Sequence, residues 1–208
     1  MTVKFFVSVL IIILAGVIAV LGFKLKNCAA KKADCSKTAN EHGFRTIDPL
    51  KFDESLFKLI SKDWMLILGE HDGKQNAMTA SWGMAGHLWN KHVANVFIRP
   101  QRYTKQFIDG AETYSLNFFD ESHRDTLNYM GTVSGRNEDK IAKTGLTVVH
   151  ENGTAYFKEA RVVIICRKLY VQQFTPESFV DSSIPQKNYA KNDFHFSYIG
   201  GIEKILIK

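Results

Sequence analysis

The sequence predicts a mainly β fold, a small barrel with short helices, over residues 44–208. Of the 208 residues, 45% are hydrophobic and 12% aromatic, which is enough for one sizeable core. Runs of strand character are frequent, and the two helix-like runs, 103–109 and 122–129, are short. The predicted strands are 64–70, 75–82, 93–99, 114–119, 160–174 and 194–208.

Local patterns support several of these elements. The first two strands are joined by His71-Asp72-Gly73-Lys74, and Asp-Gly is a hairpin signal. The helix-like run 122–129 opens with acidic residues, which suit the positive end of a helix dipole. The run 161–166 is apolar on both faces, which predicts cover on both sides by a helix, a cofactor or a second subunit. We therefore expect a homodimer.

The first 43 residues differ from the rest of the chain. Residues 5–23 carry no charge, and as a helix they would span about 28 Å, close to a hydrocarbon core of about 30 Å. Residues 1–23 are therefore predicted to be a transmembrane anchor, with a signal segment as the alternative, and residues 24–43 a polar tether. The lysines after the apolar segment predict a cytoplasmic domain, unless a signal peptide exports it.

Charge and motifs exclude several function classes. Residues 1–37 contain six lysines and one aspartate, so +5 of the net charge of +6 lies beside the apolar segment, which does not favour nucleic-acid binding. The chain has no G-x-G-x-x-G, P-loop or G-x-S-x-G motif. Its seven histidines show no metal-ligand spacing, so no metal site is expected. The three cysteines, Cys28, Cys35 and Cys166, form no disulfide framework.

Three motifs occur in one order: N-A-M-T-A-S-W-G at 76–83, R-P-Q-R-Y-T at 99–104, and G-T-V-S-G-R at 131–136 followed by Asp139-Lys140. Together they resemble the flavin reductase-like, flavoredoxin-type family. The resemblance implies a split β-barrel of Greek-key type that binds FMN, and a homodimer with FMN at or near the interface. Met130 and Gly201 depart from the family pattern, where cysteine and an acidic residue are common.

An FMN site needs paired donors for a phosphate and an apolar wall for a flat ring. Arg102, Ser81, Thr104 and Lys140 are the phosphate candidates, and the ring would lie along 77–82 and 117–119. Arg102 also fits a surface ion pair, and Trp82, Phe118 and Phe119 also fit a core. The predicted FMN-binding residues are Asn76, Ala77, Met78, Thr79, Ala80, Ser81, Trp82, Arg102, Thr104, Asn117, Phe118, Phe119, Ser134, Arg136 and Lys140.

The resemblance implies an oxidoreductase that passes electrons from NAD(P)H through flavin to an acceptor. No catalytic acid or base is required, because the protein's part is orientation. His195 is a candidate for positioning the nicotinamide or the ring edge, or is a hydrogen-bonded structural histidine. The alternatives are an FMN electron carrier that serves a membrane redox partner, and a pyridoxamine-phosphate-oxidase-like barrel with another ligand.

Overall fold

The computed structural model describes residues 39–208, which belong to two units, Met1–Thr46 and Ile47–Lys208. In the first unit, the side chain of Asn40 accepts hydrogen bonds from the backbone N–H groups of His42 and Phe44 and so closes a turn. The predicted anchor, 1–23, and most of the tether, 24–43, lie outside the described residues. Among residues 39–208, no helix is long and apolar enough to cross a membrane.

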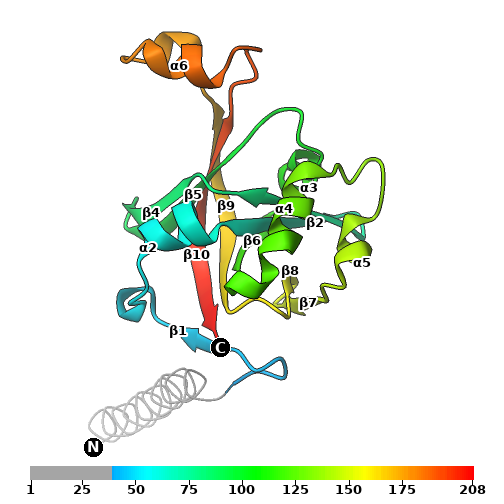
Figure 1. Cartoon of the computed structure of the whole chain (residues 1–208). Coiled ribbons are helices and arrows are strands. Elements are labelled where there is room, and N and C mark those ends of the chain that lie inside the picture. Colours follow the sequence, from blue (N-terminus) through cyan, green and yellow to red (C-terminus); the bar gives the residue numbers. More distant parts are fainter. Residues whose placement is uncertain (1–38) are drawn as a thin grey trace, which may run out of the picture. The chain divides into compact units, whose positions relative to one another are not determined.

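Strands dominate the described chain, which confirms the mainly β prediction (Figure 1). The strands are β1 (Arg45–Ile47), β2 (Met65–His71), β3 (Lys74–Ala80), β4 (Gly83–Leu88), β5 (Lys91–Ile98), β6 (Thr113–Phe118), β7 (Val148–Glu151), β8 (Thr154–Phe157), β9 (Val162–Gln173) and β10 (Phe196–Ile207). The α-helices are α2 (Leu56–Lys58), α3 (Thr104–Gly110), α4 (Arg124–Thr132), α5 (Lys140–Thr144) and α6 (Ser183–Asn188). Shorter or irregular turns are η1 (Pro49–Lys51), η2 (Leu59–Asp63), η3 (Glu121–His123) and η4 (Pro176–Ser178).

The main sheet of the second unit runs in the order β3-β2-β6-β9-β10-β5-β4. All six predicted strands are present, and their boundaries differ from the predicted ones by at most two residues. Both ends of this order, β3 and β4, are edge strands, and they are joined in the chain by Ser81 and Trp82. The predicted strand 75–82 therefore ends two residues early, and those two residues connect the edges of a curled sheet.

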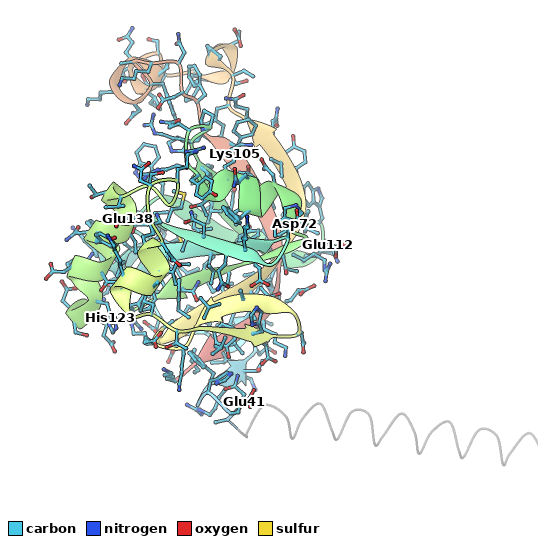
Figure 2. The ribbon with its side chains drawn as sticks, turned by 90° about the vertical axis from the view of Figure 1, so that its right-hand side faces the viewer. Glu41, Asp72, Lys105, Glu112, His123 and Glu138 are labelled. Carbon is cyan, nitrogen blue, oxygen red and sulfur yellow. The ribbon has the colours of Figure 1, made fainter. Side chains whose placement is uncertain are left out.

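Tight turns fix the register of two hairpins, β2–β3 and β7–β8. The predicted Asp72-Gly73 turn is confirmed, because both residues have positive φ angles of 52° and 68° between β2 and β3. Figure 2 shows Asp72 at the surface. Strands β7 and β8 were not predicted, although they are joined by Asn152-Gly153, which is a strong hairpin signal. Strand β4 was not predicted either, because its two glycines hide the alternating pattern of a strand.

The outer face of β9 is covered near its start, at Val163 and Ile165, by the β7–β8 hairpin. Val162, Ile164 and Cys166 point into the main core, so Val163 and Ile165 point to the opposite face. Their partners on β6 are Asn117 and Ser115, whose side chains hydrogen-bond the backbone of β8 at Phe157 and Ala155. The expectation that a helix, a cofactor or a second subunit covers this strand was wrong, because a short hairpin of the same chain does so.

Strands β9 and β10 continue beyond the barrel into an arm, residues 174–195, that carries η4 and α6 (Figure 1). Aromatic rings hold the arm together: Tyr189 stacks on Phe194 with centroids 4.7 Å apart, and Phe179 lies 5.9 Å from Phe194. Arg99, which follows β5, forms an ion pair with Asp193 and donates a hydrogen bond to the carbonyl of Asn188. The base of the arm is thereby fixed beside β3 and β5.

Candidate functional site

A groove runs along β3, and its walls come from the three sequence motifs. It consists of two adjoining cavities with volumes of about 320 and 270 Å³, which share Met78, Arg99 and Arg102. We call the first the cationic half and the second the aromatic half. The cationic half is lined by Asn76, Met78, Arg99, Gln101, Arg102, Tyr103, Thr104, Thr132, Val133, Ser134, Gly135 and Lys140. The aromatic half is lined by Met78, Thr79, Ala80, Ser81, Trp82, Phe97, Arg99, Arg102 and His195.

Two cations in the cationic half have only carbonyl partners. The Arg102 guanidinium donates to the carbonyl of Gly131 at 2.7 Å. The Lys140 ammonium is 3% exposed and donates to the carbonyls of Met130 and Val133, at 2.8 and 3.2 Å. Within residues 39–208, neither cation forms an ion pair with a carboxylate, whereas Arg99 is paired with Asp193. The cationic half therefore holds uncompensated positive charge and is suited to an anion.

Burial makes this charge costly in the absence of an anion. It lowers the pKa of Lys140 to about 8, and the positive charge of Arg102 contributes to the same shift. The pKa of Arg102 is also lowered, first by burial and then by the charge of Arg99. An anion that contacts both groups would reverse these shifts. The donor set thus fits a phosphate group, since guanidinium and ammonium groups both bind phosphate oxygens.

Close backbone packing positions these cations. The side-chain amide of Asn76, on β3, donates to the hydroxyl of Thr104 at 2.7 Å and so fixes the start of α3. The loop that leads to Lys140 passes over Asn76 at Gly135, where a Cβ atom would lie 2.2 Å from the Asn76 side-chain oxygen. Only glycine allows this approach. The close packing also explains why the third motif contains glycine at this position.

The aromatic half presents a flat wall beside a neutral histidine. The rings of Trp82 and His195 lie 5.2 Å apart, and a hydrogen bond of 2.8 Å joins the His195 Nδ1 atom to the Tyr189 hydroxyl. His195 is 8% exposed. Burial, together with the charge of Arg99, lowers the pKa of His195 to about 4, so its imidazole is neutral at pH 7. The neutral imidazole adds no further positive charge to the two arginines, Arg99 and Arg102, that also line this half of the groove.

The depressed pKa of His195 predicts an acid-sensitive contribution to stability. A folded pKa of about 4 lies below the unfolded value of about 6.5, so stability is fully present above pH 6.5 and is lost as the pH falls toward 4. Lowering the pH from 7 to 5 should reduce the free energy of unfolding of the unsubstituted chain by roughly 1 to 2 kcal/mol more than that of the His195→Gln variant. Urea unfolding at both pH values measures this difference. Equal losses in the two proteins would contradict the assignment of a neutral, buried imidazole.

Some predicted site residues lie elsewhere. The side chain of Asn117 is buried and donates to the carbonyl of Leu66 and to the hydroxyl of Ser115. Phe118 belongs to the main core, and Phe119 packs against Phe157 with centroids 6.0 Å apart. The side chains of 117–119 thus do not line the groove.

Other predicted residues lie at the groove or behind it. Ala77 is fully buried and does not line either half of the groove. The side chain of Thr79 donates to the carbonyl of Leu127 on α4. At the groove itself, Ser134 lines the cationic half, whereas the exposed Arg136 donates to the carbonyl of Gln101 and packs over the Tyr103 ring at 4.9 Å. Arg136 therefore supports the loop at the rim of the groove.

Sequence analysis did not assign a role to Arg99 or Tyr189. Arg99 lines both halves of the groove and binds the arm, and Tyr189 holds His195 from within the arm. Arg99 is the first residue of the second motif, which was the available signal. Tyr189 lies outside every motif, and only the folding of the arm brings it to His195.

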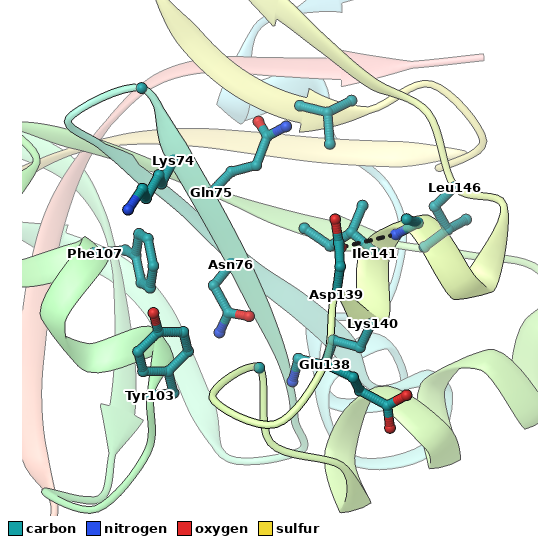
Figure 3. Close-up of a pocket in the computed structure, with 14 residues that line it drawn as sticks. Lys74, Gln75, Asn76, Tyr103, Phe107, Glu138, Asp139, Lys140, Ile141 and Leu146 are labelled. Carbon is teal, nitrogen blue, oxygen red and sulfur yellow. Dashed lines mark hydrogen bonds between the residues drawn. The ribbon is translucent and has the colours of Figure 1, made fainter.

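A polar cavity of about 520 Å³ lies across Asn76 and Gly135 from the cationic half (Figure 3). Its carboxylates already have partners, because Asp139 accepts a hydrogen bond from the N–H of Ala142 and Glu138 forms an ion pair with Lys143. Figure 3 shows Glu138 and Asp139 on the same loop that brings Lys140 to the groove. The two carboxylates make this cavity less suited to an anion than the groove.

The chain is similar in sequence to one family and in fold to several solved structures. The family described as "Flavin reductase like domain" matches residues 58–178. Comparison with curated proteins gives no match.

The structural matches cover most of the chain. Flavoredoxin from Methanosarcina acetivorans matches with a TM-score of 0.57 and 20% identity, over 70% of this chain and 68% of that chain. An FMN-binding domain of a flavin reductases-like enzyme from Shewanella baltica OS155 matches with a TM-score of 0.58 and 14% identity, over 79% of this chain and 76% of that chain. A putative flavin reductase with a split barrel domain from Shewanella frigidimarina NCIMB 400 matches with a TM-score of 0.55 and 19% identity, over 73% of this chain and 72% of that chain. The fold is therefore a split β-barrel.

Proposed function

Because this chain belongs to the flavin reductase-like domain family, we propose that it binds FMN in the groove along β3 and transfers electrons from NAD(P)H to an acceptor. The observation that carries the proposal is a pair of cations, the half-buried Arg102 and the buried Lys140, which have carbonyl partners but no carboxylate among residues 39–208. A flat aromatic wall lies at the other end of the same groove. A phosphate joined to a flat ring satisfies both ends.

Each part of the groove has a role in this proposal. Arg102 and Lys140 would hold the phosphate, and the hydroxyls of Thr104 and Ser134 would complete its shell. The backbone of β3, an edge strand, would meet the polar edge of the ring, while Trp82 and His195 pack beside it. Bound FMN would supply the redox chemistry. The chain supplies position and exclusion of water, so no acid or base is needed among its side chains.

The proposal is tested with the purified full chain and FMN under anaerobic conditions. Visible absorption measures whether the flavin bands shift on binding and whether they bleach after NADH or NADPH is added. Binding followed by bleaching is the expected result. Absence of binding would contradict the proposal, and bound flavin that stays oxidised would replace the reductase by an electron carrier that takes electrons from a partner protein.

We also propose that the chain forms a homodimer through an apolar surface at the tip of the β4–β5 hairpin. Trp89 is 53% exposed and Tyr170, on β9, is 42% exposed, and their rings lie 6.1 Å apart. Leu88, next to Trp89, is also exposed. Large aromatic residues that contact one another at the surface are typical of protein interfaces.

Trp89→Glu is expected to convert the dimer to a monomer, because it places a charge in the centre of the apolar contact. Light scattering after size exclusion measures the mass of the unsubstituted and variant chains. Leu50→Glu is the matched control, because Leu50 is also an exposed apolar residue but lies in η1 and not in the β4–β5 hairpin or β9. A monomeric unsubstituted chain, or a dimeric Trp89→Glu variant, would contradict this interface.

For the residues outside the described range, we propose a membrane anchor at 1–23 that leaves the barrel in the cytoplasm, near a membrane redox partner. The support is the uncharged run 5–23 and the lysines that follow it. Extraction of membranes with alkaline carbonate tests the anchor. Release of the chain into the supernatant would contradict it.

A further inference from the structure

A second, larger pocket adjoins the aromatic half of the groove. Its volume is about 670 Å³, which is in the range of small-molecule sites, and it shares Ser81, Trp82 and Phe97 with the aromatic half. A ligand in this pocket would therefore lie next to whatever occupies the aromatic half. We call it the apolar pocket.

Rings and aliphatic side chains form the walls of the apolar pocket. Trp82 and Phe97 belong to the barrel, Phe57 comes from α2, and Met84 from β4. Phe179 and Tyr189 come from the arm. The arm thus closes one side of the pocket, and the contacts of Arg99 to Asp193 and Asn188 fix the arm in that place.

The apolar pocket differs in charge from the groove along β3. Within the part of the chain that the structure describes, no residue lining the apolar pocket is charged, and the polar side-chain groups of its lining residues are the hydroxyls of Ser61, Ser81 and Tyr189 and the indole N–H of Trp82. An anionic ligand would lose its hydration here without gaining a cation. The nucleotide phosphates of NAD(P)H are therefore poorly suited to this pocket, whereas an uncharged ring would pack against its aromatic walls.

We infer that the apolar pocket binds the electron acceptor, and that the acceptor is a neutral cyclic molecule of the quinone type. This inference rests on the proposed function. Two electrons and two protons would pass from fully reduced FMN, FMNH2, to the quinone, which becomes a hydroquinone while the flavin returns to its oxidised form. Among the hydroxyls, that of Ser81 is the donor that the pocket offers to a quinone oxygen, because the Tyr189 hydroxyl is hydrogen-bonded to His195 and the Ser61 hydroxyl donates to the carbonyl of Phe57.

The inference is tested by equilibrium binding to the oxidised, FMN-loaded full chain, in which no electron transfer occurs. Isothermal titration compares menadione with naphthoquinone sulfonate, which adds a negative charge to a similar ring. We expect menadione to bind at least about tenfold more tightly, because the pocket lacks a cation. Similar affinities for the two ligands would overturn the inference.

Met84→Lys provides the specificity test, with Val180→Lys as its matched control. Met84 lines the pocket and is 56% exposed, so a lysine there can reach both pocket and solvent. Val180 lies in the arm, is fully exposed and does not line the pocket. The preference for menadione is the Kd of naphthoquinone sulfonate divided by the Kd of menadione. This ratio should fall at least fivefold, or about 1 kcal/mol, in Met84→Lys only. A similar fall in Val180→Lys, or none in Met84→Lys, would overturn the inference.

Two further readouts separate the possible failures. FMN binding and bleaching by NAD(P)H are recorded on the same samples, so that their loss contradicts the proposed function and their retention leaves it intact. Light scattering during the titration shows whether a second copy of the chain covers the pocket. Binding of menadione that disappears as the chain dimerises would assign the pocket to subunit contact and overturn the inference.

Discussion

Arg102→Ala is expected to weaken FMN binding by about 1.5 to 3 kcal/mol, which is roughly a ten- to hundredfold rise in Kd. The guanidinium lies in the cationic half of the groove, has a carbonyl partner at Gly131, and has no carboxylate partner among residues 39–208. Its removal takes away a charge-assisted contact with the phosphate. Fluorescence titration of FMN, whose emission changes on binding, measures the effect.

Arg136→Ala is the matched control for this substitution. Arg136 is also an arginine of the three motifs, but its side chain is exposed and contacts Gln101 and Tyr103 at the rim. We expect its Kd to change less than threefold, since exposed charges are screened. Arg102→Lys should fall between the two, because it keeps the charge and loses the paired donors. An unchanged Kd in a folded Arg102→Ala chain would contradict the phosphate assignment.

FMN affinity is expected to fall as the pH rises above about 8, because Lys140 then loses its proton. Burial, with the charge of Arg102, holds the pKa of Lys140 at about 8 in the free protein, and a bound phosphate would raise it. Binding above pH 8 therefore requires the uptake of a proton. Between pH 7 and 9.5, we expect a loss of affinity of roughly tenfold.

The variants Lys140→Met and Lys143→Met test whether Lys140 is the group whose titration weakens FMN binding. Lys140→Met should bind FMN more weakly at pH 7 and show a flat profile up to pH 9.5. Lys143 lies on the same helix, but it is exposed and paired with Glu138, which raises its pKa. The Lys143→Met profile should follow that of the unsubstituted chain. A Lys140→Met profile that still falls above pH 8 would assign the titration to another group.

The pKa of Lys140 has the opposite consequence for stability of the protein without FMN. Its folded pKa of about 8 lies below the unfolded value of about 10.4, so the unfolded chain binds the proton more tightly. The destabilisation is fully present below pH 8 and is relieved as the pH rises toward 10.4. Stability and FMN affinity should therefore change in opposite directions over the alkaline range.

Local patterns predicted the barrel strands well, because their signals are contained in a few adjacent residues. The Asp72-Gly73 turn and the apolar run of β9 are examples. Strand β4 was missed because glycines at 83 and 86 remove the side chains that would show alternation. The cover of Val163 and Ile165 was misassigned because it comes from β8. The backbone of β8 is held by hydrogen bonds to side chains of β6, and not by pairing with a strand of the main sheet.

The part of the candidate site that the three motifs supply could be predicted from the sequence. Three of the four predicted phosphate residues, Arg102, Thr104 and Lys140, lie together in the cationic half. The fourth, Ser81, was misplaced, because it lines the aromatic half at the end of β3, and Ser134 lies beside the other three instead. The side chains of Asn117, Phe118 and Phe119 belong instead to the core and its cover, which the sequence alone could not distinguish from a cofactor wall. The aromatic half depends on Tyr189 and the arm, whose positions follow from long-range contacts.

The pairing of β5 with β10 has a consequence for the order of folding. It joins residues 93–98 to residues 196–201, about a hundred positions apart, whereas the β2–β3, β4–β5 and β7–β8 hairpins close over short turns. Loop closure over such a distance carries a larger entropic cost, and non-local pairings slow folding. His195 and the contact between Arg99 and Asp193 depend on this late closure. The groove along β3 would then be completed near the end of folding, so its ligand would act by trapping the native barrel rather than by templating its assembly.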